Sequence, residues 1–373
     1  MLTSRFQDKE LSLLGFGAMR LPTLPTGEID ENQVDEMVRL AMEQGVNYFD
    51  TAYPYHGGMS EGVMGRVLSK YPRETWYLAD KYPGHQIAET YDPAAIFEDQ
   101  LRKCGVDYFD FYLMHAQNRR NYEKYQACRA YETAFALKEE GKVRHVGISF
   151  HDSADILDKI LSDHPQIEVV QLQFNYLDFD EPSVQSRLCW EVCWKHGKPV
   201  IVMEPVKGGT LVNLPEEAAE VFAALGGSPV SYAIRFAAGF EGIMMVLSGM
   251  STLEMVEENC GFMADFQKLS DEEMAAVNKV RDIFHAQHLI PCTACKYCTE
   301  VCPQGIRIPD LFACMNAKKQ FNSWTAAYHY STTVKESAAP ADCLKCGLCE
   351  DACPQNLKIR DLLEDVAKEF EQK

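Results

Sequence analysis

Two runs of cysteines near the C-terminus constrain this 373-residue chain more than any other feature. The first run is Cys292-x2-Cys295-x2-Cys298-x3-Cys302-Pro303, and the second repeats its spacing as Cys343-x2-Cys346-x2-Cys349-x3-Cys353-Pro354. Three thiolates at two-residue gaps can each reach a different iron of one cubane, and in two-cluster ferredoxins the fourth cysteine ligates the other cluster. The runs therefore predict two 4Fe–4S clusters, one held by Cys292, Cys295, Cys298 and Cys353 and the other by Cys302, Cys343, Cys346 and Cys349.

A zinc site is the alternative for any C-x2-C pair, but zinc rarely uses a run of four cysteines that ends in proline. Between the runs, residues 308–321 predict a helix whose Pro309 suits a first turn, and residues 359–370 predict another. Residues 286–373 are therefore expected to form a small, mainly helical, dicluster ferredoxin-like domain. The remaining cysteines lack ligand spacing and are expected to be small buried hydrophobes: Cys104, Cys128, Cys189, Cys193, Cys260 and Cys314.

Short apolar, β-branched or aromatic segments recur along residues 1–285 with helical stretches between them. They are 14–18, 46–50, 75–80, 109–114, 145–149, 169–173, 199–203 and 243–247. Helix boundary signals fill the intervals: Asp92-Pro93 and Ser228-Pro229 open helices, and Ser270 begins a capping box. The pattern predicts an α/β fold, a (β/α)8 TIM barrel over residues 1–285. A doubly wound open sheet is the alternative, although no complete glycine-rich phosphate turn follows the first strand.

Charge and the N-terminal sequence bear on partners and location. The formal net charge is −19, whereas nucleic-acid and anionic-membrane binding need a basic face. No apolar run is long enough to span a bilayer, and the polar N-terminus is unlike a signal peptide. We therefore expect no nucleic-acid partner, no membrane span and a cytoplasmic protein.

Four residues of different chemical types are expected at the C-terminal ends of three consecutive strands, where barrels place their chemistry. Asp50 ends the second strand and is followed by Tyr55, Lys81 follows the third, and His115 follows the fourth. A tyrosine hydroxyl is a weak acid, and an adjacent ammonium should lower its pKa. The carboxylate would hold the lysine, and the histidine would orient a carbonyl while the tyrosine gives its proton. Each residue also has an ordinary structural interpretation instead of a catalytic one: Asp50 as a cap, Lys81 as a solvated side chain and His115 as a buried, satisfied side chain.

These residues stand in motifs that resemble the aldo-keto reductase family over residues 11–260. Leu14-Gly15-Phe16-Gly17-Ala18-Met19-Arg20 resembles the family's first strand, Asp50-Thr51-Ala52-x-x-Tyr55 its Asp–Tyr signature, and Tyr112-Leu113-Met114-His115 its histidine strand. The resemblance implies a catalytic tetrad of Asp50, Tyr55, Lys81 and His115, with Tyr55 as general acid.

The resemblance also implies contacts to a nicotinamide cofactor. The asparagine that normally follows the serine of strand five is missing, since Phe150 and His151 stand there. Gly249 and Met255 stand where NADP-selective relatives carry cations, so either NADPH or NADH is expected. The implied contacts are Met19, Ser149, Gln171, Met203, Pro205, Lys207, Gly208, Gly209, Gly249, Ser251, Glu258 and Asn259.

Nearly the whole chain resembles the reductases that carry a C-terminal two-cluster domain. The expected function is NAD(P)H-dependent reduction of a small carbonyl substrate, with the clusters exchanging electrons with a redox partner protein. Two alternatives stay open. The clusters serve structure only, or the protein is an electron carrier whose barrel is not a working reductase or binds flavin. No residue pattern indicates a flavin, which usually stands between hydride and one-electron chemistry.

Overall fold

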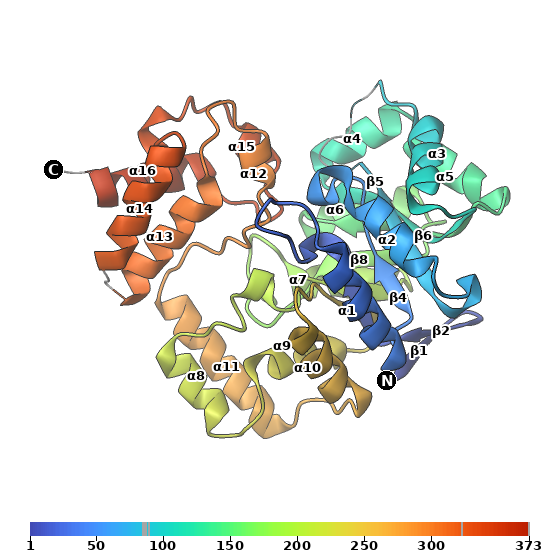
Figure 1. Ribbon diagram of the computed structural model, residues 1–373, viewed down its shortest axis with the longest axis horizontal. Coiled ribbons are helices and arrows are strands. Elements are labelled where there is room, and N and C mark those ends of the chain that lie inside the picture. The colour runs from blue at the N-terminus through green and yellow to red at the C-terminus, as the bar shows by residue number, and fades with distance from the viewer. Residues whose placement is uncertain (84–87, 89, 322–323, 372–373) are drawn as a thin grey trace. The chain divides into compact units, whose positions relative to one another are not determined.

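The computed structural model describes residues 1–83, 88, 90–321 and 324–371 and divides into two compact units (Figure 1). The first unit comprises residues 1–205 and 230–270, and the second comprises residues 206–229 and 271–373. The loop that follows the seventh barrel strand therefore groups with the C-terminal part of the chain. The expected boundary between residues 285 and 286 stays a prediction.

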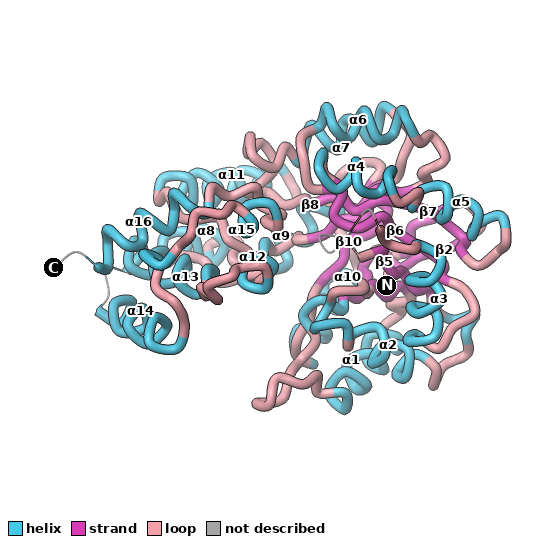
Figure 2. Tube along the Cα trace, turned by 90° about the horizontal axis from the view of Figure 1, so that it is seen from above, coloured by secondary structure: helices cyan, strands magenta, loops and turns pink. Residues whose placement is uncertain are grey.

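The first unit is a closed barrel of eight parallel strands, shown in magenta in Figure 2. The TIM-barrel prediction is confirmed. Each strand is almost entirely buried, as strands covered on both faces must be. In barrel order they are β10 (Ile243–Ser248), β3 (Leu14–Gly17), β4 (Tyr48–Asp50), β5 (Tyr77–Tyr82), β6 (Phe109–Gln117), β7 (Val143–Phe150), β8 (Val169–Gln173) and β9 (Val200–Met203).

The helices of this unit begin and end where the sequence signals are strong. The Asp92 side chain accepts hydrogen bonds from the amides of Ala94 and Ala95, and Gly105 ends the same helix with φ +63°, a conformation that glycine adopts without strain. The helices are α1 (Glu31–Glu43), α2 (Ser60–Leu68), α3 (Pro93–Cys104), α4 (Arg119–Ala127), α5 (Ala130–Glu139), α6 (Ala154–Asp163), α7 (Ser186–Lys195), α9 (Pro229–Ala238) and α10 (Leu253–Ala264).

A hairpin that the sequence analysis did not predict lies against the barrel strands. Its strands β1 (Thr3–Phe6) and β2 (Lys9–Ser12) pair antiparallel. Phe6 and Leu11 pack with residues of the barrel interior, including Phe111 and Val169. Phe111 and Val169 lie near the starts of their strands, so the hairpin covers the N-terminal end and leaves chemistry to the opposite end.

The second unit is helical, as predicted, and its two cysteine runs form a structural repeat offset by 51 residues (Cys292 to Cys343). In each half a short helix contains the third cysteine and a long helix follows the fourth, and the equivalent helices of the two halves contact each other. The helices are α8 (Glu216–Ala223), α11 (Asp271–Ala286), α12 (Tyr297–Glu300), α13 (Ile308–Phe321), α14 (Trp324–Glu336), α15 (Leu348–Asp351) and α16 (Ile359–Glu371).

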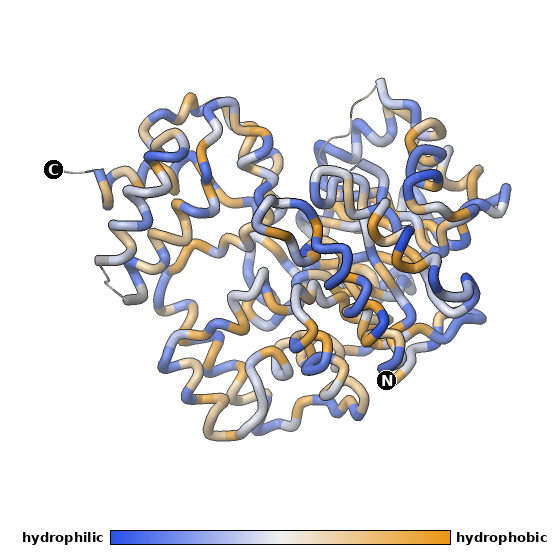
Figure 3. Tube along the Cα trace, in the orientation of Figure 1, coloured by the Kyte–Doolittle hydropathy of each residue, from blue (hydrophilic) through white to orange (hydrophobic). Residues whose placement is uncertain are grey.

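Many helices alternate between hydrophilic and hydrophobic residues along their length (Figure 3), as helices with one buried face do. In α11 the buried face consists of Ala276, Val277, Val280 and Phe284. None of the helices in the described ranges is both long and apolar enough to cross a membrane.

Candidate active site and cluster sites

The structure brings all four residues of the predicted tetrad together. Asp50 ends β4, Lys81 lies in β5 and His115 lies in β6, so three neighbouring strands supply them. Tyr55 begins the short 3-10 turn 55–58 that follows β4. Their exposed fractions are 3%, 0% and 5% for the strand residues and 9% for Tyr55. Lys81 and His115 lie inside their strands, because β5 and β6 run further than the sequence pattern indicates.

The ammonium of Lys81 is the centre of this group. Its Nζ donates to Asp50 Oδ1 at 2.5 Å, to the Thr51 carbonyl oxygen at 2.7 Å and to Tyr55 Oη at 3.3 Å. Three acceptors satisfy the three donors of an ammonium, and a buried lysine needs such partners to stay charged. Lys81 is therefore not the solvated side chain of the structural alternative.

Burial sets the acidity of Tyr55. Its pKa is raised well above the ordinary value, first by burial and then by the negative charges of Asp50 and Glu204, while Arg20 opposes the shift. The net direction is the reverse of the expectation that the adjacent ammonium lowers it. Tyr55 therefore carries its proton at neutral pH.

His115 and Asp50 complete the arrangement. The ring of His115 stands edge-on to the ring of Tyr55, with centroids 5.8 Å apart, and the Tyr125 hydroxyl holds the His115 carbonyl oxygen at 2.9 Å. Burial raises the pKa of Asp50, and the hydrogen bonds from Lys81 and Gln171 lower it less than burial raises it. Gln171 Nε2 donates to Asp50 Oδ2 at 3.1 Å, so this predicted nicotinamide contact lies directly beside the tetrad.

The other predicted nucleotide contacts of the first unit lie around the C-terminal rim. Ser149 Oγ accepts from the Ala116 amide at 2.8 Å, and Ser251 Oγ donates to the Arg20 carbonyl oxygen at 2.7 Å. Asn259 Nδ2 donates to Ser248 Oγ at 2.8 Å. The remaining residues of this group are Met19 and Met203, both half-buried, Pro205, which is buried, and Gly249 and Glu258, both exposed.

Lys207, Gly208 and Gly209 lie in a turn of the second unit. Lys207 is 1% exposed, and its Nζ lies 3.5 Å from Oε1 of Gln355, two residues beyond Cys353. The structure therefore places the predicted pyrophosphate lysine against the second cysteine run. Spacing alone could not have indicated this neighbour.

Arg20 is a rim residue that the sequence analysis missed as a contact. Its side chain packs 3.4 Å from the position that a Cβ on Gly249 would take, and its guanidinium lies 3.5 Å from Glu204 Oε1. No cation is expected at Gly249 from its own segment, yet the cationic side chain of Arg20, from the 3-10 turn that follows β3, packs beside it. The first-strand motif contains Arg20, but only the fold brings β3 and β10 side by side.

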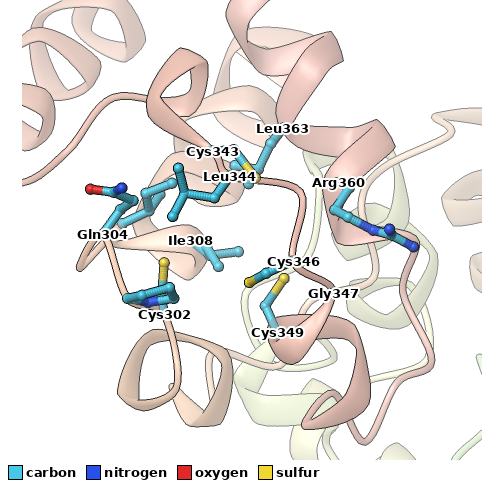
Figure 4. Close-up of a pocket in the computed structure, with 12 residues that line it drawn as sticks. Cys302, Gln304, Ile308, Cys343, Leu344, Cys346, Gly347, Cys349, Arg360 and Leu363 are labelled. Atoms are coloured by element: carbon cyan, nitrogen blue, oxygen red, sulfur yellow. The ribbon is translucent and has the colours of Figure 1, made fainter.

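One set of four cysteines borders a cavity in the second unit (Figure 4). Cys302 from the first run and Cys343, Cys346 and Cys349 from the second line a space of about 340 Å³, part of it open to solvent. Burial, together with the neighbouring charges of Glu350, Cys343 and Cys302, raises the pKa of Cys349 to about 11. This grouping is the crossed one that the sequence analysis describes.

The other set gathers around Cys298. Burial raises the pKa of the Cys298 thiol, and the neighbouring thiols that add to the shift are Cys295, Cys292 and Cys353. In both runs the first sulfur accepts a hydrogen bond at 3.4 Å from the amide two residues later, Ala294 in one and Lys345 in the other. Over the described residues, no three His, Cys, Asp or Glu side chains gather as they would around a single metal ion. Of the other cysteines, Cys104, Cys128, Cys189, Cys193, Cys260 and Cys314 are buried.

Comparisons with known proteins agree with this architecture. The model of the aldo/keto reductase family matches residues 13–282, and the model of the 4Fe-4S dicluster domain matches residues 291–357. A solved aldo-keto reductase of Bacillus halodurans, in its holo form, is 26% identical with a TM-score of 0.60 over 73% of this chain and 93% of its own. An aldo-keto reductase of Klebsiella pneumoniae in complex with NADPH shares the fold, with 20% identity and a TM-score of 0.61 over 75% of this chain and 94% of its own.

Two curated relatives match the reductase part. NADH-specific methylglyoxal reductase of Escherichia coli is 27% identical over 55% of this chain and 67% of its own length. L-galactose dehydrogenase of Arabidopsis thaliana is 26% identical over 71% of this chain and 88% of its own length. The chain belongs to the aldo/keto reductase family, and a C-terminal 4Fe–4S dicluster domain follows its reductase domain.

Proposed function

We propose that this chain catalyses the NAD(P)H-dependent reduction of an aldehyde or ketone, with Tyr55 as the general acid. The observation that carries the proposal is the buried ammonium of Lys81, which reaches both Asp50 at 2.5 Å and the Tyr55 hydroxyl at 3.3 Å. A reduced nicotinamide, when bound, would supply the hydride.

The tetrad residues divide the remaining work. Tyr55 holds its proton at neutral pH because burial raises its pKa, so it can give that proton to the carbonyl oxygen. Lys81 stabilises the phenolate that remains, since an ammonium beside it favours the charged form. Asp50 accepts a hydrogen bond from Lys81 and holds it in place. His115, edge-on to Tyr55, would orient the oxygen.

Gln171, Ser149 and the rim residues around Ser251 would hold the nucleotide. The related Escherichia coli enzyme is named NADH-specific, whereas the Klebsiella pneumoniae structure contains NADPH. We propose both coenzymes for this chain, since the family's usual cations are missing at Gly249 and Met255 while Arg20 packs beside Gly249.

A matched pair of tyrosine variants tests the reductase proposal. Tyr55→Phe should lose carbonyl reduction, because the proton donor is removed while the ring stays. Tyr48→Phe is the control: its ring is fully buried in β4, and its hydroxyl has no hydrogen-bond partner among the described residues. The measurement is coenzyme oxidation with a panel of small aldehydes and ketones. Retained turnover in Tyr55→Phe would refute the assignment.

We further propose that the two crossed cysteine sets each hold a 4Fe–4S cluster and that these clusters exchange electrons with a redox partner protein. A single zinc ion draws its sulfurs to about 2.3 Å, whereas Cys302, Cys343, Cys346 and Cys349 line a pocket that is partly open to solvent. That donor set of four thiols around an open space fits a cluster.

Iron content tests the ligand sets. Cys295→Ala should lose about half of the iron and acid-labile sulfide, because it removes one ligand of one four-cysteine set. Cys314→Ala is the control, since this buried cysteine lies in α13 of the same unit and belongs to neither set. Full iron in Cys295→Ala would refute the pairing.

Anaerobic titration with NADH and NADPH separates electron exchange from a structural role. Bleaching of the cluster absorbance together with an EPR signal supports exchange. Normal carbonyl reduction without bleaching would instead favour clusters that only stabilise the domain. Bleaching in a protein without reductase activity would favour an electron carrier.

A further inference from the structure

Two buried carboxyl groups lie directly behind Lys81, and the proposed mechanism does not use them. Glu61 on α2 and Asp80 on β5 are both 0% exposed, and their side chains are hydrogen-bonded to each other. Asp80 precedes Lys81 in the chain, and its Oδ1 accepts from the Lys81 amide at 2.8 Å. Acidic side chains are almost never fully buried unless they have partners, so this pair requires an explanation.

The close packing of two helices puts Glu61 in this place. Gly65 of α2 lies so near to α3 that a Cβ on it would be 2.3 Å from the carbonyl oxygen of Cys104. One turn earlier in α2, Glu61 Oε1 accepts from Gln100 Nε2 at 3.0 Å. The same Gln100 Nε2 donates to the Lys81 carbonyl oxygen at 3.0 Å. The network therefore holds the main chain of Lys81 on both sides.

The cations around the pair are shared with other carboxylates. From α3, Lys103 donates to Glu61 Oε2 at 3.0 Å, but it also pairs with Asp99 at 3.1 Å and is 30% exposed. From β5, the Lys81 ammonium is bonded to Asp50. Among the described residues, the other titratable groups that face the pair are neutral thiol and phenol groups: Cys104 of α3, Tyr112 of β6 and Tyr55.

Two buried carboxylates in contact cannot both be ionised at neutral pH. Burial raises the pKa of Asp80 well above its usual range, and the charge of Glu61 adds to the shift. Burial raises the pKa of Glu61 too, but the hydrogen bonds from Gln100 and Lys103 and the charge of Lys103 oppose that shift, so the charge belongs on Glu61 and the proton on Asp80. The protonated Asp80 can donate to Glu61 while it accepts from the Lys81 amide.

The protonation of Asp80 matters for Tyr55. A negative charge on Asp80 would raise the pKa of Tyr55 further and would give Lys81 a second carboxylate neighbour. Both effects weaken Tyr55 as a proton donor. A neutral Asp80 leaves Asp50 as the carboxylate that pairs with the Lys81 ammonium.

We propose that Glu61 is a positioning residue for carbonyl reduction: it holds a proton on Asp80, and so keeps a second negative charge away from Lys81 and Tyr55. This inference rests on the proposed reductase function. Glu61 touches neither substrate nor coenzyme in this role and acts through Asp80.

A set of three variants of the holoprotein tests the inference. Glu61→Gln keeps the shape but removes the charge and supplies an amide donor, so Asp80 should ionise more readily. We expect kcat at pH 8 to fall up to about tenfold, the effect of one pKa unit in a proton donor, with KM unchanged. Asp80→Asn should keep kcat near that of the unchanged protein. The double variant Glu61→Gln/Asp80→Asn should recover kcat, and its pH profile should lack the fall that Glu61→Gln shows.

A merely structural role for Glu61 gives a different outcome. The double variant would then be no better than Glu61→Gln, and the loss would not depend on pH. Either result, or a Glu61→Gln variant with unchanged kcat from pH 6 to pH 9, would overturn the proposal.

A second measurement does not depend on turnover. Because Asp80 is protonated in the folded state and ionised in the unfolded state above pH 4, its contribution to stability declines as pH rises. The melting temperature should therefore fall more steeply with pH in the unchanged protein than in Asp80→Asn. Equal slopes would overturn the inference even if the protein proves not to be a reductase. If the slopes differ but Tyr55→Phe keeps its activity, the reductase proposal fails instead.

Discussion

Replacement of Lys81 by methionine should destabilise the barrel strongly. Lys81 is 0% and Asp50 is 3% exposed. Methionine keeps the length and most of the volume of the side chain, so the change removes charge rather than packing. The Asp50 carboxylate then keeps only the Gln171 amide, 3.1 Å away, of the two side-chain donors described for it. Removal of one partner of a buried pair costs about 3–5 kcal/mol, a large part of a typical stability of about 5–15 kcal/mol.

The cost should depend on pH. Lys81 lowers the pKa of Asp50 against the effect of burial, so its removal raises that pKa further. In the variant, folded Asp50 holds a proton that the unfolded chain releases above pH 4, and the free energy of unfolding falls as pH rises. The slope approaches about 1.4 kcal/mol per pH unit, until the pH exceeds the raised pKa. The loss should therefore be smaller at pH 5 than at pH 7.

Urea unfolding in a Trp324→Phe background measures this cost. The fluorescence then comes from Trp76, Trp190 and Trp194, all of which lie in the first unit. The double variant Asp50→Asn/Lys81→Met should recover most of the stability and lose the pH dependence, since no buried charge remains. A loss below about 1 kcal/mol, the range of surface pairs, or a loss that does not change with pH, would refute the reasoning.

Three further outcomes are expected. Gly65→Ala should lower the free energy of unfolding by about 1–3 kcal/mol, because its Cβ would be 2.3 Å from the Cys104 carbonyl oxygen. Gly62→Ala in the same helix should be neutral in the same urea titration, because its Cβ would meet the flexible end of Arg66 at 3.3 Å and the Lys103 carbonyl oxygen at an ordinary 4.0 Å. Glu168, whose pKa is lowered to about 2, should contribute about 2 kcal/mol above pH 4.5 and lose it as pH falls through 2, so Glu168→Gln should approach the unchanged protein in acid melts. Turnover in the oxidation direction should rise with pH up to pH 9, while reduction stays flat, because Tyr55 remains protonated; a steep fall of reduction between pH 6 and pH 8 would contradict this.

The residues with strict spacing could be predicted from the sequence. The distance from Asp50 to Tyr55 spans one tight turn after a strand, so the pair is local, and the cysteine runs fix which thiols share a face. Lys81 and His115 could be predicted because parallel strands deliver their C-terminal ends to one rim. The sequence pattern could not show which residues, distant in sequence, each side chain contacts in the folded protein. Lys207 stands in a loop that resembles a phosphate site, yet its ammonium is buried beside Gln355.

The direction of the Tyr55 pKa shift illustrates the same limit and bears on the chemistry. Sequence shows that an ammonium stands nearby, and an ammonium alone would make the phenol more acidic. It does not show that Tyr55 is 9% exposed or that the charge of Glu204, which follows β9, acts on it. In the folded protein, burial and the neighbouring negative charge raise the pKa of Tyr55, and the phenol keeps its proton. A site built this way favours giving a proton to a carbonyl over taking one from an alcohol, since the second task needs the phenolate that burial disfavours.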